Sequence, residues 1–335
     1  GDNLEKRIKR IGRTQSYMSA DVIRRFLNVS KIDESGIFFD GNYYIVCFRV
    51  EVDNTMAFER IYVNLRKKNM SYRVAYFSQG YYFVSLYLKS NEAETIETVE
   101  NKFITVINEC FESVATYRLN MNDLFVNMTD YFRMECTSSI SWEKQNFTKL
   151  FQSQNIDFRE KSYVKKENSY LRVYQIIDIN RGVGNSENMY EEIMKLPGIN
   201  SVVSDFDSVL DRYVVASMKK LYLDIDDVIA KIRLQNPDLY NAYISTNTQA
   251  DDETYSFILA GLTLVIEANT LDKLDEYSKS LFECSERNSF EVLKLENMQE
   301  KAYANLCLLS GYSKNMRMYV IDEGIDFLPY LYATK

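Results

Sequence analysis

Histidine, the side chain that most often carries acid–base chemistry near neutral pH, does not occur in this chain of 335 residues. Its absence excludes Ser–His–Asp and Cys–His nucleophilic constellations, metal sites with histidine ligands, and every imidazole acid or base. A large part of ordinary enzyme chemistry is therefore excluded before any motif is considered.

The five cysteines are dispersed along the chain and form no CxxC pair. Four of them lie in apolar stretches, which predicts buried thiols, and the odd number argues against a disulfide framework. We therefore expect a reducing compartment and no nucleophilic cysteine. The five are Cys47, Cys110, Cys136, Cys284 and Cys307.

Two clusters of aspartate are candidates for carboxylate chemistry. Asp224, Asp226 and Asp227 lack the alternating oxygen ligands and the glycine of a calcium loop, so we interpret them as a solvated helix face. A carboxylate- or metal-dependent enzyme that uses Asp224 and Asp227 stays open as an alternative. The second cluster follows a predicted strand and is interpreted as helix capping. It consists of Asp205, Asp207 and Asp211.

A glycine-containing segment at 182–186 lies between a predicted strand and a predicted helix, where phosphate-binding loops occur. The third glycine of a GxGxxG motif would fall at Glu187, and no GxxxxGK[ST] motif exists anywhere in the chain. We therefore predict a tight turn followed by a helix cap at Ser186, and no cofactor in this chain.

An aromatic run at 79–86 partly resembles the third strand of an RNA-recognition motif, in which aromatic rings stack on bases. Gln79, Tyr82 and Leu86 depart from that pattern, and the net charge of −8 disfavours binding to a phosphate backbone. Sheet packing or a protein interface is the favoured interpretation of Tyr81 and Phe83. A module that binds single-stranded nucleic acid through strand 81–87 stays open as an alternative.

Basic residues are concentrated near the N-terminus, and we interpret them as a solvated tail that could also contact anionic lipid or an acidic partner. They are Lys6, Arg7, Lys9, Arg10 and Arg13. No run of eighteen apolar residues and no signal-peptide core occurs, so we expect a soluble, cytoplasmic chain.

The elements that position these residues follow the same order twice, strand–helix–strand–strand–helix–strand and then a helix. The first set has strands at 36–52, broken by a turn at 40–42, and at 71–78, 81–89 and 116–119, with helices at 53–69, 96–114 and 122–134. The second has strands at 169–179, 199–206, 255–267 and 290–295, with helices at 186–196, 270–287 and 298–310.

This order predicts an α+β fold of two ferredoxin-like (split βαβ) units with antiparallel sheets, the second carrying a long helical insertion. The boundaries follow from composition and pattern. We expect a basic segment at 1–35, a first unit at 36–135, a linker at 136–168, a second unit at 169–315 with its insertion at 207–250, and a C-terminal segment at 316–335.

Several segments of the chain resemble a known family. They are ENSYLRVYQIIDI at 167–179, YSFILAGLTLVIEANTLDKLDEYSKSL at 255–281, LKLENMQEKAYANLCLLSGYSKN at 293–315 and, more weakly, RLNMNDLFVNMTDYFR at 118–133. Together they resemble the N-terminal, non-motor region of the type IV secretion and conjugation ATPases, the CagE/TrbE/VirB group. The tail MRMYVIDEGIDFLPYL at 316–331 resembles the passage that leads into the motor domain of that family.

The resemblance implies docking rather than catalysis. Because this chain has no Walker A lysine and no Walker B strand, the catalytic residues of the family have no positions here, and ATP would be hydrolysed in a separate downstream domain. The implied partners are inner-membrane components of a secretion channel and neighbouring subunits of a ring. The implied location is the cytoplasmic face of the membrane, with nucleic acid not expected as a partner.

Overall fold

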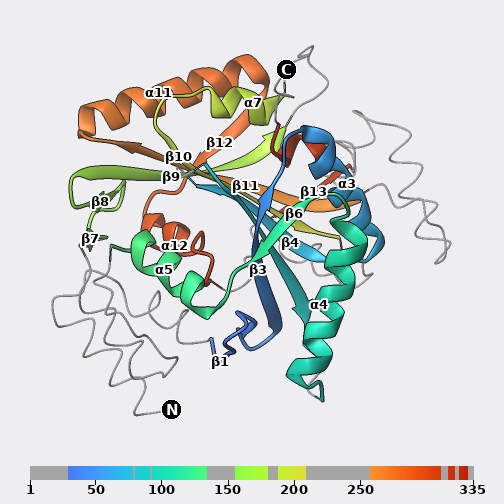
Figure 1. Ribbon diagram of the computed structural model, residues 1–335. Helices are drawn as coiled ribbons and strands as arrows, with labels where there is room; N and C mark the ends of the chain where they lie inside the picture. The colour runs from blue at the N-terminus through green and yellow to red at the C-terminus, as the bar shows by residue number, and fades with distance from the viewer. Residues whose placement is uncertain are drawn as a thin grey trace, which may run out of the picture.

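The computed structural model describes residues 29–77, 80–90, 93–133, 155–179, 188–208, 257–310, 316–320 and 324–330 (Figure 1). Within these ranges the chain has a mixed α+β fold, with one large antiparallel sheet and six α-helices. The basic cluster, the glycine turn, Cys136 and nearly all of the insertion predicted at 207–250 lie outside the described residues.

The first half of the fold runs from residue 31 to residue 131. Its elements are β1 (Lys31–Ile32), β2 (Phe38–Phe39), β3 (Tyr43–Glu51), α3 (Thr55–Lys67), β4 (Ser71–Phe77), β5 (Tyr82–Lys89), α4 (Ile96–Cys110), β6 (Ala115–Arg118) and α5 (Met121–Tyr131).

The second half runs from residue 156 to residue 304, and a C-terminal segment follows it. The elements are β7 (Ile156–Asp157), β8 (Val164–Lys166), β9 (Ser169–Ile179), α7 (Met189–Met194), β10 (Ile199–Asp207), β11 (Phe257–Ala268), α11 (Leu271–Asn288), β12 (Phe290–Lys294), α12 (Gln299–Ala304), β13 (Arg317–Val320) and the 3₁₀ turn η1 (Ile325–Phe327).

All strand pairs in the sheet are antiparallel. The main path is β1-β2-β3-β5-β4-β10-β11-β9-β8-β7, and β6, β13 and β12 pair with β3, β11 and β9 respectively. On either side of the β4–β10 pair the order is therefore mirrored, with β5, β3 and β6 on one side and β11, β9 and β12 on the other. The two halves share one sheet through β4 and β10.

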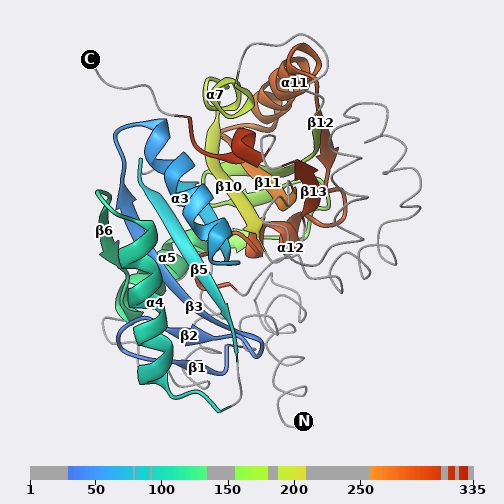
Figure 2. The ribbon, with the colours of Figure 1, turned by 90° about the vertical axis from the view of Figure 1, so that its right-hand side faces the viewer.

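Helices cover both faces of the sheet. One face packs against α3, α4, α7 and α11, and we call it the four-helix face. The opposite face packs against α5 and α12, and we call it the two-helix face. Figure 2 shows α3 and α4 side by side against the strands of the first half. Because both faces are covered, strands such as β4 are buried along nearly their whole length.

Local sequence explains most helix ends. The Asn54 side chain accepts a hydrogen bond from the Ala57 N–H at 3.1 Å and so begins α3. Asn120 and Asp123 form a reciprocal capping box at the start of α5. The helix predicted near residue 96 begins after Thr95 rather than after the acidic sequence at 91–94.

The helix predicted at 298–310 is shorter than expected, since α12 ends at Ala304. The carbonyl of Asn305 accepts hydrogen bonds from Arg73 Nη1 at 2.6 Å and from Ser310 Oγ at 3.0 Å. A continuing helix would need that carbonyl for the N–H four residues later. The long-range contact with Arg73 therefore replaces the last turns of the predicted helix.

Arg73 and Asp205 form a buried ion pair where the two halves meet. They lie directly opposite each other on β4 and β10, with Nε 2.7 Å from Oδ1 and side chains only 2% and 7% exposed. Burial disfavours the guanidinium charge, but the Asp205 carboxylate together with Tyr87 and Cys47 outweighs it, so the pKa of Arg73 is raised. The interpretation of Asp205 as a helix cap is wrong, because Asp205 lies within β10. Asp207 ends the same strand and accepts a hydrogen bond from Ser71 Oγ.

A pair of tyrosines joins the two helices of the two-helix face. Tyr131 of α5 and Tyr303 of α12 stack with ring centroids 4.2 Å apart, and each hydroxyl donates to the main-chain carbonyl of the other at 2.8 Å. Lys166 of β8 lies over both rings, and burial lowers its pKa. Contacts between the halves therefore extend beyond the shared sheet.

The range predicted as a linker contributes strands where it is described. β7 and β8 form a hairpin that extends the sheet from β9. The sequence pattern does not reveal them, because the strands are only two and three residues long and lie in a polar segment.

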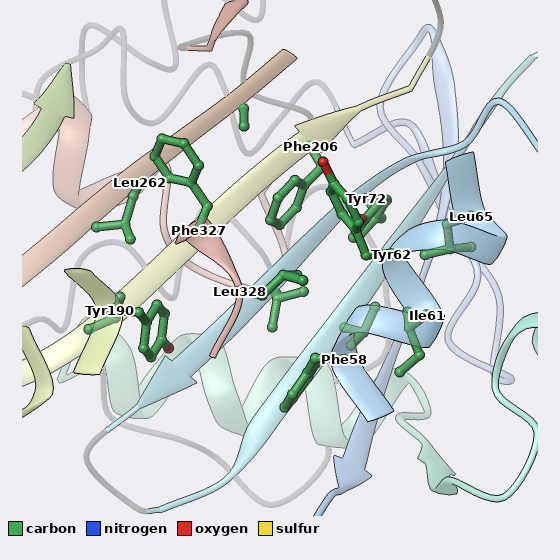
Figure 3. Close-up of a cluster of buried hydrophobic side chains, with 14 of the residues drawn as sticks. Phe58, Ile61, Tyr62, Leu65, Tyr72, Tyr190, Phe206, Leu262, Phe327 and Leu328 are labelled. Carbon is green, nitrogen blue, oxygen red and sulfur yellow. The ribbon is translucent and has the colours of Figure 1, made fainter. Parts of the chain in front are cut away.

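The C-terminal segment packs into the four-helix face. Figure 3 shows Phe327 and Leu328 between the side chains of α3 and Tyr190 of α7, with Phe206 of β10 nearby. Both residues are buried, and Ser204 Oγ donates to the Phe327 carbonyl at 2.6 Å. This segment thus spans helices from the two halves.

None of the helices in the described ranges is long and apolar enough to cross a membrane.

We predict that Asp205→Asn destabilises the protein by about 3–5 kcal/mol, because it leaves the buried Arg73 charge without its counter-ion. The free energy of unfolding, measured by urea denaturation, checks this. The double variant Arg73→Met, Asp205→Leu is expected to lose less than the single variant, since neither charge remains. Equal losses in the two would contradict a charge effect.

We also predict that Gly324→Ala destabilises the fold by roughly 1–3 kcal/mol. A Cβ at this position would collide with Tyr62 Oη and would lie 2.7 Å from Ile258 Cγ2. In a Tyr62→Phe background the same substitution should cost less, because the hydroxyl has been removed. A double-mutant cycle on unfolding free energies measures this coupling, and strict additivity would contradict it.

Candidate interaction surface

The two aromatic residues singled out in strand 81–87 lie in different environments. Tyr81 is 43% exposed, whereas Phe83 is 8% exposed and belongs to the core beneath α5. Phe83 packs against Phe77, with ring centroids 5.7 Å apart. Of this pair only Tyr81 is therefore available at the surface, and the row of stacking rings typical of an RNA-recognition motif is incomplete here.

Arg49 joins Tyr81 to a third residue that the sequence analysis missed, Tyr117. The Arg49 guanidinium carbon lies 4.6 Å from the ring centroid of Tyr81 and 4.7 Å from that of Tyr117. Both distances are in the range of cation–π contacts. We call Arg49, Tyr81 and Tyr117 the arginine–tyrosine cluster.

The strands explain why these three residues meet. Side chains alternate between faces along β3, so Cys47 and Arg49 point to the two-helix face while Phe48 and Val50 point into the four-helix core. Tyr117 of β6 lies directly opposite Arg49 in the ladder, and Tyr81 immediately precedes β5, on the other side of β3. The cluster therefore spans three neighbouring strands.

The cluster carries positive charge that is weakly neutralised. The nearest carboxylate that ion-pairs with Arg49 is Glu51, at 3.7 Å, and the two side chains are 30% and 55% exposed. An exposed pair at this distance contributes little stability. Arg49 Nε is itself buried and has no hydrogen-bond partner within the described chain. The planar cation is thus held by two rings, and because Nε is buried, an acidic group can reach it only at its Nη groups.

A lone arginine in an otherwise apolar strand was the signal that could have revealed this surface. Strand β3 reads YYIVCFRVE, and the strand that holds Arg73 reads SYRVAYF. The same sequence pattern corresponds to two different environments in the structure, a surface cluster at Arg49 and a buried ion pair at Arg73. Only the pairing of the strands distinguishes them.

A second polar feature lies at a break in the edge of the sheet. β8 and β12 both pair with the same edge of β9, and between them Val173 has no strand partner on that edge, although β11 pairs with it on the other. The Gln299 side chain fills this place, since its Oε1 accepts from the Val173 N–H at 2.8 Å and its Nε2 donates to the Val173 carbonyl at 3.0 Å. The main-chain groups of β9 are therefore satisfied across the break.

Beside this break lies a cavity of about 420 Å³. Arg172 spans it, donating to the Ser162 carbonyl and to Asp275 and Ser278 of α11. Lys279, Lys294 and Glu296 also line it. This mixture of charges favours no single class of ligand.

The described cysteines are structural. Cys47, Cys110, Cys284 and Cys307 are all buried, as predicted. Burial raises the pKa of Cys47 and of Cys307 to about 12, so both remain thiols at neutral pH. Cys47 Sγ lies 3.1 Å from Ser85 Oγ within the core.

The described residues contain no group of three or more Cys, Asp or Glu side chains arranged to hold a metal ion. Asp224, Asp226 and Asp227, the acidic residues considered for such a site, lie outside the described ranges, as do Lys6, Arg7, Lys9, Arg10 and Arg13. The predictions made for these residues remain predictions.

No protein-family model matches the chain, and no curated protein matches it. Among solved structures the chain is similar to the crystal structure of an unknown protein from Galdieria sulphuraria. That similarity covers 75% of this chain and 96% of the other, with 9% sequence identity and a TM-score of 0.19. A TM-score of this size supports no inference about fold or function.

We predict that the protein loses stability in alkaline solution. The ordinary thiol pKa is 9.0, while burial raises that of Cys307 to about 12, so the unfolded chain releases this proton first. The stability contributed by the protonated thiol is complete below pH 9 and is lost as the pH rises toward 12. Each such group adds a slope of about 1.4 kcal/mol per pH unit.

Urea denaturation at successive pH values measures this slope. Cys307→Ala should reduce it, whereas the matched variant Cys110→Ala should reduce it less, because the Cys110 pKa is raised less strongly. An unchanged slope in Cys307→Ala would contradict the assignment.

Proposed function

We propose that this chain is a non-catalytic assembly and docking domain that belongs to a type IV secretion or conjugation ATPase. In this proposal it contacts inner-membrane components of the channel and neighbouring copies of itself at the cytoplasmic face of the membrane. ATP is bound and hydrolysed by a motor domain that is not part of this chain, and the chain itself needs no cofactor.

The observation that supports docking most directly is the arginine–tyrosine cluster. Arginine and tyrosine are enriched among the residues that dominate binding energy at protein interfaces. Here two half-exposed tyrosines hold an arginine in a fixed orientation on a sheet whose faces are otherwise largely covered by helices. Binding a partner there costs little side-chain entropy in the cluster, because its three side chains are already ordered.

The partners and the burial of the other polar groups also favour docking over catalysis. Arg73 and Asp205 neutralise each other in the core, Gln299 completes the hydrogen bonds of β9, and the described thiols are buried. In each case the group serves the fold. The carboxylate- or metal-dependent enzyme remains the alternative for Asp224 and Asp227.

The finer architecture that we propose is two ferredoxin-like units. In each half the fourth strand lies beside the first and the third lies between the first and the second, as in the split βαβ arrangement. The four strands are β3, β4, β5 and β6 in one half and β9, β10, β11 and β12 in the other. The mirrored order about β4 and β10 supports a duplication of this unit.

Chemical crosslinking in cells of the native host tests the proposed partners. The affinity-tagged chain is expected to crosslink to inner-membrane components of a type IV secretion channel and to copies of itself. Crosslinks to single-stranded nucleic acid in place of these proteins would contradict the proposal and favour the nucleic-acid alternative.

ATP hydrolysis by the purified chain tests the non-catalytic part. The rate should equal that of a protein-free blank with Mg²⁺ present. Turnover above the blank that co-purifies with the chain would overturn this part of the proposal.

A further inference from the structure

The arginine–tyrosine cluster lies next to an open edge of the sheet. Within the described residues β6 pairs with no strand other than β3, and it lies at the outer edge in Figure 2. The Leu119 N–H donates to the Cys47 carbonyl, which fixes the hydrogen-bond phase of this ladder. Because the phase alternates, the N–H and C=O groups of Tyr117 face β3, while those of Thr116 and Arg118 face outward.

These outward groups form a template for another strand. Thr116 and Arg118 make no main-chain hydrogen bond to any other described segment. A partner strand would pair with β6, and its side chains would alternate between the two faces of the sheet. Those on the face of Tyr117 would lie beside Tyr117, with Arg49 as the next residue along that face. The Arg118 side chain is already paired with Glu100, so it does not compete for that partner.

The opposite edge of the sheet is less suited to strand addition. β12 and the β7–β8 hairpin both lie outside β9 there, and the register of β12 with β9 shifts between Glu291 and Val292. β12 also carries the charged residues Glu291 and Lys294. Bulges and edge charges both discourage pairing with a further strand.

The charge at the β6 edge selects the occupant. The Arg49 guanidinium lies between two tyrosine rings and has one weak ion pair, with the exposed Glu51. An incoming carboxylate can therefore form an ion pair with a cation that is already positioned. We propose that the β6 edge is a docking site for an extended segment of a partner protein that carries an acidic side chain, held by main-chain pairing with β6 and by Arg49. This site rests on the proposed docking function and specifies the chemistry of its partner.

A protein segment fits this surface better than a nucleic acid does. A nucleic acid has no main-chain N–H and C=O groups to pair with Thr116 and Arg118. Phe83, which lies opposite Arg49 on this face, is buried and offers no ring on which a base could stack. Binding of single-stranded nucleic acid is therefore treated as a competing outcome of the test.

The test uses the full chain and a fluorescent seven-residue peptide in which valine alternates with glutamate. Fluorescence anisotropy at low ionic strength measures its dissociation constant. A peptide with lysine in place of glutamate should bind at least roughly ten-fold more weakly, and an oligothymidine of similar length should not compete. Hydrogen exchange should slow at the outward-facing amides of Thr116 and Arg118 when the acidic peptide is present.

Two variants probe the two kinds of contact. Arg49→Gln should weaken binding of the acidic peptide by roughly ten-fold or more, because the cation is lost. Thr116→Pro removes an outward N–H without touching the ladder to β3, and it should also abolish the exchange protection. The control is Arg60→Gln, which removes an exposed arginine from α3 on the opposite face and should leave binding unchanged.

The outcomes separate this site from the proposed function. No binding of the acidic peptide, equal binding of the lysine peptide, or displacement by oligothymidine would overturn the site. If the crosslinks to channel components persist in that case, the proposed function stands without it. If the acidic peptide binds as expected but no channel component crosslinks, the site stands and the family assignment fails.

Discussion

The ion pair between Arg73 and Asp205 determines how the two halves of the protein fit together. It joins the central pair of strands at a single register, Arg73 opposite Asp205. A slip of one residue would move every side chain of β4 to the other face and would place the guanidinium among the aromatic rings of Tyr72 and Phe206. Apolar strands alone tolerate such slips more easily. The pair also fixes the carbonyl of Asn305, so one guanidinium positions three segments that are far apart in the sequence.

The junction is held from both sides of the sheet. On the two-helix face, Tyr131 and Tyr303 exchange hydrogen bonds between α5 and α12. On the four-helix face, Phe327 and Leu328 lie between α3 and α7, and Ser204 holds the backbone of that segment (Figure 3). Because each contact joins elements from different halves, the halves are expected to move as one body. The arginine–tyrosine cluster is therefore presented by a rigid support.

Hydrophobic periodicity predicts the local elements of this fold well, but it predicts the long-range pairing of strands poorly. The helices at Thr55–Lys67 and Leu271–Asn288 follow from their caps and apolar stripes. The pairing of β4 with β10 joins residues more than a hundred positions apart, and no local pattern encodes it, which explains why Asp205 resembled a cap. The meeting of Arg49 with Tyr117 is hidden for the same reason, since strand order alone makes them neighbours. Sheet packing and an interface were both predicted for Tyr81 and Phe83, and the sequence could not assign one to each, because an aromatic strand does not reveal which of its faces is covered.

The side-chain amide of Gln299 stands where a peptide group of a neighbouring strand would otherwise lie. In consequence, β8 and β12 can remain separate strands, and the integrity of β9 does not depend on the lengths of the segments that flank the break. Relatives of this protein could therefore gain or lose residues between β7 and β8, or between β12 and α12, without leaving a dry, unpaired peptide in the sheet. One carboxamide makes this corner of the fold tolerant of insertion.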